Sequence, residues 1–194
     1  MNWLVLAVSG WILFGLELGM RDLLAIGPGR VAPSFIAALV AVVALSAPAR
    51  TALWAGLALG LVADLTRLVD QPDGGVTTIV GPYALGFMLG AHLVVTIRGA
   101  LMRRNPLTVG FATMALVAIA QVVVVALTTL RSFYEPIVWS AGSELLLRLG
   151  SAVYSGLAAI LLSLVLLPLS ELLGFAHAPG HAAPQRFRIG MRNR

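Results

Sequence analysis

Long apolar stretches with very few charges run through most of the chain. Between Pro33 and Leu65 the only charged residues are Arg50 and Asp64. A transmembrane helix needs about 20 consecutive, mostly apolar residues. Of the 194 residues 59% are hydrophobic and 11% charged, whereas a soluble domain has about 25% charged residues. The sequence therefore predicts an all-α integral membrane protein and argues against a soluble globule or a disordered chain.

Breaks in the apolar stretches divide the chain into helices. As one helix, residues 33–65 would rise about 50 Å, beyond a hydrocarbon core of about 30 Å, and Pro48 and Arg50 interrupt them. We expect two short spans there; a re-entrant hairpin is the alternative. The first stretch lacks a basic start and a small-residue cleavage site, so we read it as a retained helix. The prediction is one domain, residues 1–170, with spans at about 3–20, 33–47, 51–66, 76–97, 107–130 and 144–167, and a flexible basic tail, residues 171–194.

The arginines are distributed unequally between the two sides of such a bundle. With six spans, one side receives Arg50, Arg98, Arg103, Arg104, Arg186, Arg188, Arg192 and Arg194, and the other receives Arg21, Arg30, Arg67 and Arg131. The side richer in Arg is normally cytoplasmic. We therefore expect both termini in the cytoplasm, and a re-entrant hairpin would leave this parity unchanged.

Small residues and one acid repeat every four positions in the third span: Ala52, Gly56, Gly60 and Asp64. Such a stripe lets another backbone approach closely, and an ionisable group at membrane depth usually has a specific partner. Packing inside the bundle and docking of a partner helix both fit. We adopt the docking hypothesis, with Gly56, Gly60 and Asp64 as partner-binding residues.

A second stripe of this kind, Pro82, Gly86 and Gly90, occurs in the fourth span. Its spacing places the three residues on one helix face. We expect this face to pack against the third span.

Two pairs of opposite charges are spaced four residues apart, with Glu before Arg, which is the favourable order on a helix. These pairs are Glu17 with Arg21 and Glu144 with Arg148. We predict structural ion pairs for both. The alternative for the second pair is a substrate pocket lined by Glu144 and Arg148.

The sequence contains no recognisable catalytic set. It has no Cys and three scattered His, and no pattern of a nucleophile with its base, a zinc site or a phosphate-binding loop. We expect a protein that is not an enzyme and uses no cofactor or metal. The Arg-rich tail is typical of a segment that touches anionic headgroups, and we do not expect nucleic-acid binding.

The central third of the chain resembles the rod shape-determining MreD family. Members pair a Pro-led helix with a helix of the pattern Gly-x-x-x-Asp and a Gly-containing loop. The matching segments lie between about residues 30 and 110: Ala32-Pro33-Ser34, Ala47-Pro48-Ala49-Arg50, the run from Gly56 to Leu65 that includes Gly60 and Asp64, and the loop with Gly75. The loop after Val69 departs from the usual pattern of the family.

The resemblance implies a non-enzymatic subunit of the bacterial cell-elongation (rod) complex in the inner membrane. Such a subunit binds MreC directly and helps to couple MreB filaments to peptidoglycan synthesis by a transpeptidase and a glycosyltransferase. On this basis Gly75 joins the partner-binding residues. The fold is also similar to the substrate-binding subunits of energy-coupling-factor transporters, which gives the alternative: a vitamin-binding subunit. That function needs several converging polar groups, and only Glu144, Arg148, Ser151 and Gln121 are in place to contribute.

Overall fold

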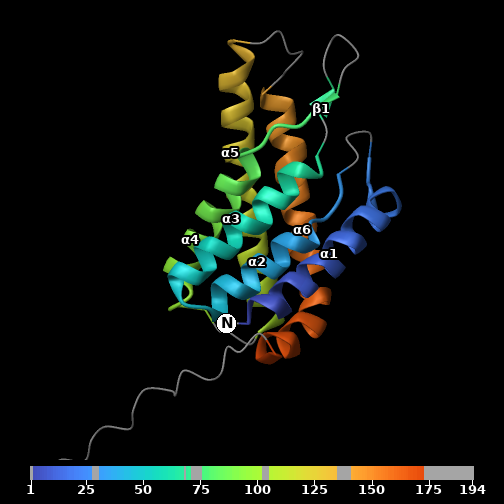
Figure 1. Ribbon diagram of the computed structural model, residues 1–194. Coiled ribbons are helices and arrows are strands. Elements are labelled where there is room, and N and C mark those ends of the chain that lie inside the picture. Colours follow the sequence, from blue (N-terminus) through green and yellow to red (C-terminus); the bar gives the residue numbers. More distant parts are fainter. Residues whose placement is uncertain are drawn as a thin grey trace, which may run out of the picture.

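The computed structural model describes residues 2–27, 31–67, 69–70, 76–101, 105–134 and 141–172. These residues form six helices and one hairpin of two short strands, each two residues long (Figure 1). The helices are α1 (Trp3–Leu24), α2 (Phe35–Ser46), α3 (Ala49–Leu65), α4 (Pro82–Ile97), α5 (Pro106–Ser132) and α6 (Ala141–Leu172), and the hairpin pairs β1 (Val69–Asp70) with β2 (Val76–Thr77). The prediction of an all-helical chain is confirmed.

Among the described residues, three helices are long and apolar enough to cross a membrane: Trp3–Leu24, Pro106–Ser132 and Gly142–Pro168. Two others, α2 and α4, are apolar but shorter. With 12 residues, α2 rises only about 18 Å. The structure therefore supports membrane association, and it makes α2 too short to cross a bilayer as a straight helix by itself.

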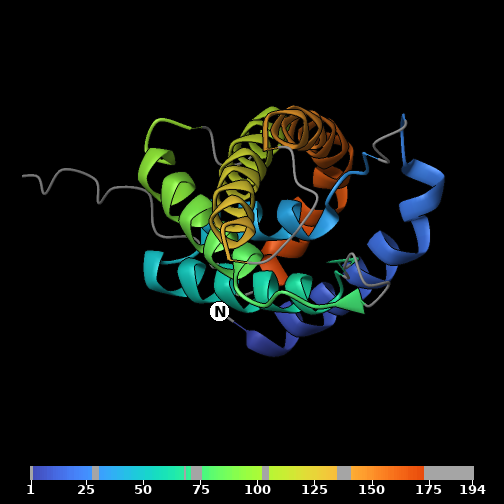
Figure 2. The same cartoon turned by 90° about the horizontal axis from the view of Figure 1, so that it is seen from above.

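Helix α2 forms the centre of the fold. Every residue from Phe35 to Leu45 is buried, and the view from above shows α2 enclosed by α1, α3 and the pair α5 and α6 (Figure 2). A helix that is apolar all round belongs in a protein core or in lipid. The continuous run of Ala, Val, Leu and Ile in this segment thus packs against protein on all sides.

The N-terminus of α2 is closed by side chains from its own start and from α1. The first N–H groups of a helix have no partner within it, and leaving them unpaired in an apolar surrounding is costly. Ser34 Oγ accepts from the N–H of Ala37 at 3.3 Å, and Glu17 Oε2 accepts from the N–H of Ile36 at 3.1 Å and from Ser34 Oγ at 3.2 Å. The predicted pair of Glu17 with Arg21 is wrong: both residues are described, and no ion pair joins them. The carboxylate binds the positive end of α2 instead.

The C-terminus of α2 is closed by an arginine from the end of α4. Arg98 Nη1 donates to the carbonyl of Ala44 at 3.1 Å and also to the carbonyl of Ala47. A cation at this end matches the sign of the helix dipole. Arg98, which the sequence suggested only as a topology determinant, therefore also satisfies the last carbonyls of the buried helix.

Helices α3 and α4 touch through the small-residue stripe of α3. A Cβ atom placed on Gly60 would lie 2.5 Å from the Tyr83 carbonyl oxygen, and one on Gly56 would lie 2.9 Å from the Phe87 carbonyl oxygen. This face is thus filled by α4 of the same chain. The docking hypothesis for Gly56 and Gly60 is corrected, because no room remains there for a partner helix.

Helices α3 and α4 pack against each other as expected, but through the stripe of α3, whereas the second stripe, on α4, faces α5. A Cβ atom on Gly86 would lie 2.8 Å from the Cα of Ala120, and one on Gly90 would lie 2.9 Å from the carbonyl oxygen of Leu116. The sequence identified a contact face on α4 correctly but not the helix that it meets. Spacing on one helix reveals a shared face and carries no information about the neighbour.

The start of α4 and the end of α6 differ most from the expected boundaries. Helix α4 begins at Pro82 and not at residue 76, since Val76–Thr77 pairs with β1 and Pro is favoured in the first helical turn. Helix α6 continues through Pro168 to Leu172, beyond the expected end at residue 167. Neighbouring helices can satisfy the backbone group that Pro leaves free in a membrane helix, and the end of α6 turns away from its first turns (Figure 1).

Several predictions concern residues outside the described ranges. These are the loop residue Gly75, the side chains of Arg103 and Arg104, and the basic tail with Arg186, Arg188, Arg192 and Arg194. Their predicted roles stay predictions.

Candidate functional site

A cavity of about 230 Å³ lies between α1, the segment before α2, the end of α3, and helices α5 and α6. Polar and charged side chains contribute much of its wall: Glu17, Arg21, Ser34, Thr66, Arg67, Gln121, Glu144, Arg148 and Ser151. Phe14, Leu18, Val31, Ala32, Pro33 and Leu147 complete it. Polar groups are expensive within a membrane protein and gather where they have a role, so this cavity is the candidate site.

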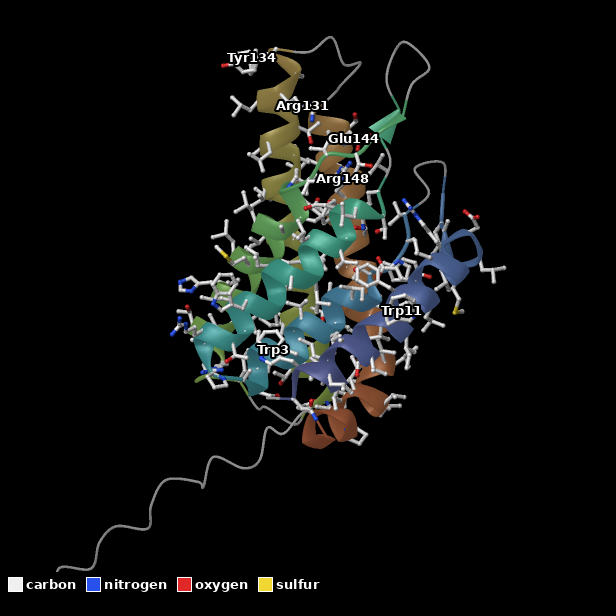
Figure 3. The ribbon with its side chains drawn as sticks, viewed as in Figure 1. Trp3, Trp11, Arg131, Tyr134, Glu144 and Arg148 are labelled. Atoms are coloured by element: carbon white, nitrogen blue, oxygen red, sulfur yellow. The ribbon has the colours of Figure 1, made fainter. Side chains whose placement is uncertain are left out.

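Glu144 and Arg148 form one side of the cavity, one turn apart on α6 (Figure 3). Arg148 Nε lies 3.1 Å from Glu144 Oε2, which confirms the predicted ion pair. Arg148 Nη1 also donates to Tyr83 Oη and to Gln121 Oε1, both at 3.2 Å. The guanidinium is therefore held in place by groups from α4, α5 and α6 together.

A second arginine, two residues after the end of α3, reaches the same phenol. Arg67 Nη1 donates to Tyr83 Oη at 2.6 Å, and its Cζ lies 4.0 Å from the centre of the tyrosine ring. Tyr83 Oη in turn donates to Gln121 Oε1 at 3.3 Å. A hydroxyl has one proton and two lone pairs, so this oxygen is fully engaged by the two arginines and the glutamine.

Asp64 fixes the position of Tyr83 through the backbone. Its Oδ1 accepts from the N–H of Tyr83 at 2.9 Å, and its Oδ2 accepts from the N–H groups of Gly81 at 2.9 Å and Ala84 at 3.0 Å. The side chain is 2% exposed. Asp64 thus closes the N-terminus of α4 in the way that an N-cap residue does. The hypothesis that it anchors a partner helix is corrected, because the carboxylate is buried and binds three N–H groups at the start of α4 in its own chain.

Among the described residues that line the cavity, positive charges outnumber negative ones. Arg21, Arg67 and Arg148 face two carboxylates, Glu17 and Glu144. Glu17 is committed to the start of α2, and Glu144 is paired with Arg148. Within the described ranges, no carboxylate forms an ion pair with Arg67. The site can therefore accept a small anion more readily than a cation.

The described residues contain no group of three or more His, Cys, Asp or Glu that could hold a metal ion. Ser151 Oγ donates to the carbonyl of Arg148 in its own helix, an arrangement that gives the hydroxyl no base. What the geometry offers is hydrogen bonding and charge, which serve binding.

The sequence pointed to part of this site. It placed Glu144, Arg148, Ser151 and Gln121 as the residues able to line a pocket, and all four do line it. It missed Arg67 and Tyr83. Arg67 comes three residues after Asp64, and Tyr83 follows Pro82 at the start of a helix. The available signal was that Arg67 and Tyr83 lie at the two ends of the segment that joins the third and fourth spans, where a polar side chain from each end can meet.

Of the remaining predicted residues, Arg50 is exposed in the first turn of α3, at the far end of that helix from Arg67. Comparisons with known proteins add nothing to this geometry: no family model matches the chain, and no curated protein or solved structure is significantly similar to it.

Proposed function

We propose that the chain is a non-catalytic subunit of the bacterial inner membrane that acts as MreD does in the cell-elongation complex. In this role it binds MreC directly. Through MreC it contributes to coupling MreB filaments to the transpeptidase and glycosyltransferase of peptidoglycan synthesis. Both termini face the cytoplasm, and the bundle has the fold of the substrate-binding subunits of energy-coupling-factor transporters.

One observation carries this proposal: the residues behind the resemblance have connected structural roles. Ser34 closes the start of the central helix α2. Gly56 and Gly60 provide the contact between α3 and α4, and Asp64 closes the start of α4. Residues with such roles are hard to replace, so a family built on this fold needs them at this spacing. The match thus rests on residues that organise the fold and not on apolar composition alone.

The partner surface lies away from the α3 stripe, since α4 covers it. Of the four residues first assigned to partner binding, Gly75 alone stays a candidate, in the loop between β1 and β2. Substitutions at Gly56, Gly60 or Asp64 should therefore affect MreC only through the stability of the bundle.

Co-purification tests this function. The full chain is expressed with an MreC-like single-pass protein from the same organism, extracted in mild detergent and captured by an affinity tag. The expected result is a stable complex that survives size-exclusion chromatography. Failure of every such pairing, with both proteins folded and inserted, would contradict the proposal.

A small-molecule-binding subunit is the second candidate, and the cavity favours it. Arg67, Tyr83 and Thr66 bring more polar groups to the cavity region than the sequence indicated. The cavity has a volume of about 230 Å³, whereas sites for drug-sized ligands have roughly 300–1,000 Å³, so the ligand of this second function would be small. Mass spectrometry of the purified protein would decide: a vitamin retained in stoichiometric amount would place this function first.

A further inference from the structure

We propose that the cavity between α1, α3 and α6 binds a phosphate group, held by Arg67 and Arg148 with Arg21 beside them. The inference goes beyond the elongation role and does not depend on MreC. It identifies the chemistry of the ligand, a phosphate, which a phospholipid headgroup or a soluble phosphate compound could supply.

The first argument is the convergence of two like charges. The Nη1 atoms of Arg67 and Arg148 lie 2.6 and 3.2 Å from the same oxygen, Tyr83 Oη. They are thus within about 6 Å of each other, close enough for like charges in a protein to repel appreciably. A bound anion would relieve this repulsion, whereas the neutral phenol only orients the two groups.

The second argument is that, among the described residues, no carboxylate forms an ion pair with Arg67. Glu144 pairs with Arg148 at 3.1 Å. Arg67 is bound by the phenol and its ring, and Arg21 is an exposed residue on the cavity wall. The guanidinium of one arginine can donate two parallel hydrogen bonds to two oxygens of a phosphate. Three arginines suit a group with three or more oxygens and up to two charges better than a carboxylate.

The third argument is size and depth. A cavity of about 230 Å³ accommodates a headgroup fragment, since the share of one water in the liquid is about 30 Å³. Arg148 is the eighth residue of α6, which places it about 10 Å along the helix axis from its start. If α6 begins at the outer edge of the headgroup region, which is about 5–7 Å thick on each side of the hydrocarbon core, Arg148 lies just below that region.

The test uses the purified full chain in a neutral detergent and phosphate-free buffer. Binding is measured by calorimetry for inorganic phosphate and glycerol 3-phosphate, and by native mass spectrometry for dihexanoyl phosphatidic acid against dihexanoylglycerol. The variants are Arg67→Gln and, as the matched control at the other end of α3, Arg50→Gln. Tyr83→Phe is a further variant that keeps both charges and removes the oxygen that orients them.

At least one phosphate probe should bind the wild type, and dihexanoylglycerol should not. Because Arg67 would donate charged hydrogen bonds to the phosphate, we expect Arg67→Gln to weaken binding about tenfold or more. Arg50→Gln should bind as the wild type does. Binding of phosphatidic acid alone assigns the phosphate to a lipid; equal binding of the soluble probes assigns it to a soluble compound. The proposal is overturned if no phosphate probe binds, or if a folded Arg67→Gln protein keeps the full affinity.

Discussion

The Oδ1 atom of Asp64, at the end of α3, accepts a hydrogen bond of 2.9 Å from the backbone N–H of Tyr83, at the start of α4. This bond crosses the loop between two helices and fixes Tyr83, whose hydroxyl accepts hydrogen bonds from two arginines of the cavity, Arg67 and Arg148. A buried carboxylate thereby links the packing of the bundle to the geometry of the candidate site.

Replacing Asp64 by Asn should destabilise the protein. The amide keeps one acceptor oxygen and turns an NH₂ group toward backbone donors, so part of the three-bond cap is lost. We expect a loss of about 1–3 kcal/mol of stability, seen as a lower melting temperature in detergent. Equal melting temperatures for wild type and Asp64→Asn would contradict the capping role.

Replacing Gly60 by Ala should also destabilise the bundle, because the new methyl group would overlap the backbone of α4. Overpacking of this kind typically costs about 1–3 kcal/mol. At Gly19 of α1 nothing lies within 4 Å of an added Cβ, so Gly19→Ala should be neutral or slightly stabilising. Thermal unfolding of the two purified variants compares them directly. A Gly60→Ala protein of normal stability that fails only in partner binding would restore the docking hypothesis.

Replacing Arg98 by Met should loosen the centre of the fold. The carbonyls of Ala44 and Ala47 would lose their donor at the end of a buried helix, and an unpaired buried polar group costs about 1–3 kcal/mol. Arg50→Met removes an exposed arginine and should leave the melting temperature nearly unchanged. Hydrogen exchange gives a second readout, in which amides near the end of α2 should exchange faster in Arg98→Met alone.

The orientation of the chain can be measured by reporter fusions. Fusions at positions 73 and 194 should report opposite sides of the membrane, with the tail in the cytoplasm, as the Arg distribution predicts. Since the chain has no cysteine, Ala49→Cys provides a single label site at the turn between α2 and α3. Labelling from the cytoplasm alone is expected. Reporters on the same side would exclude the six-span topology.

The sequence predicted those features that depend on neighbours within one helix. Hydropathy located the helices, and the spacing of Glu144 and Arg148 predicted their ion pair. The same spacing failed for Glu17, because its carboxylate finds the start of α2, where backbone N–H groups compete with Arg21. Local periodicity shows which residues share a face, and the choice among possible partners is made by tertiary packing.

Contacts between segments far apart in the sequence could therefore not be predicted from the spacing of residues. Arg98 binds carbonyls 51 and 54 residues earlier in the chain, and Arg148 meets Tyr83 65 residues away. Gly110 and Gly156, whose Cβ positions fall 2.9 and 3.0 Å from each other's carbonyl oxygens, bring α5 and α6 together. Neither glycine belongs to a repeating stripe, so no spacing marked this contact in advance.

The closed ends of α2 have a consequence for biosynthesis. Its N-terminal groups depend on Glu17, made earlier, and on Ser155, whose Oγ accepts from the N–H of Ser34 at 2.9 Å. Its C-terminal carbonyls depend on Arg98. When α2 leaves the ribosome, two of these three groups have not yet been translated. The ends of the central helix are satisfied only once α4 and the first half of α6 have been made, so a prematurely ended chain leaves backbone groups at the ends of α2 unpaired.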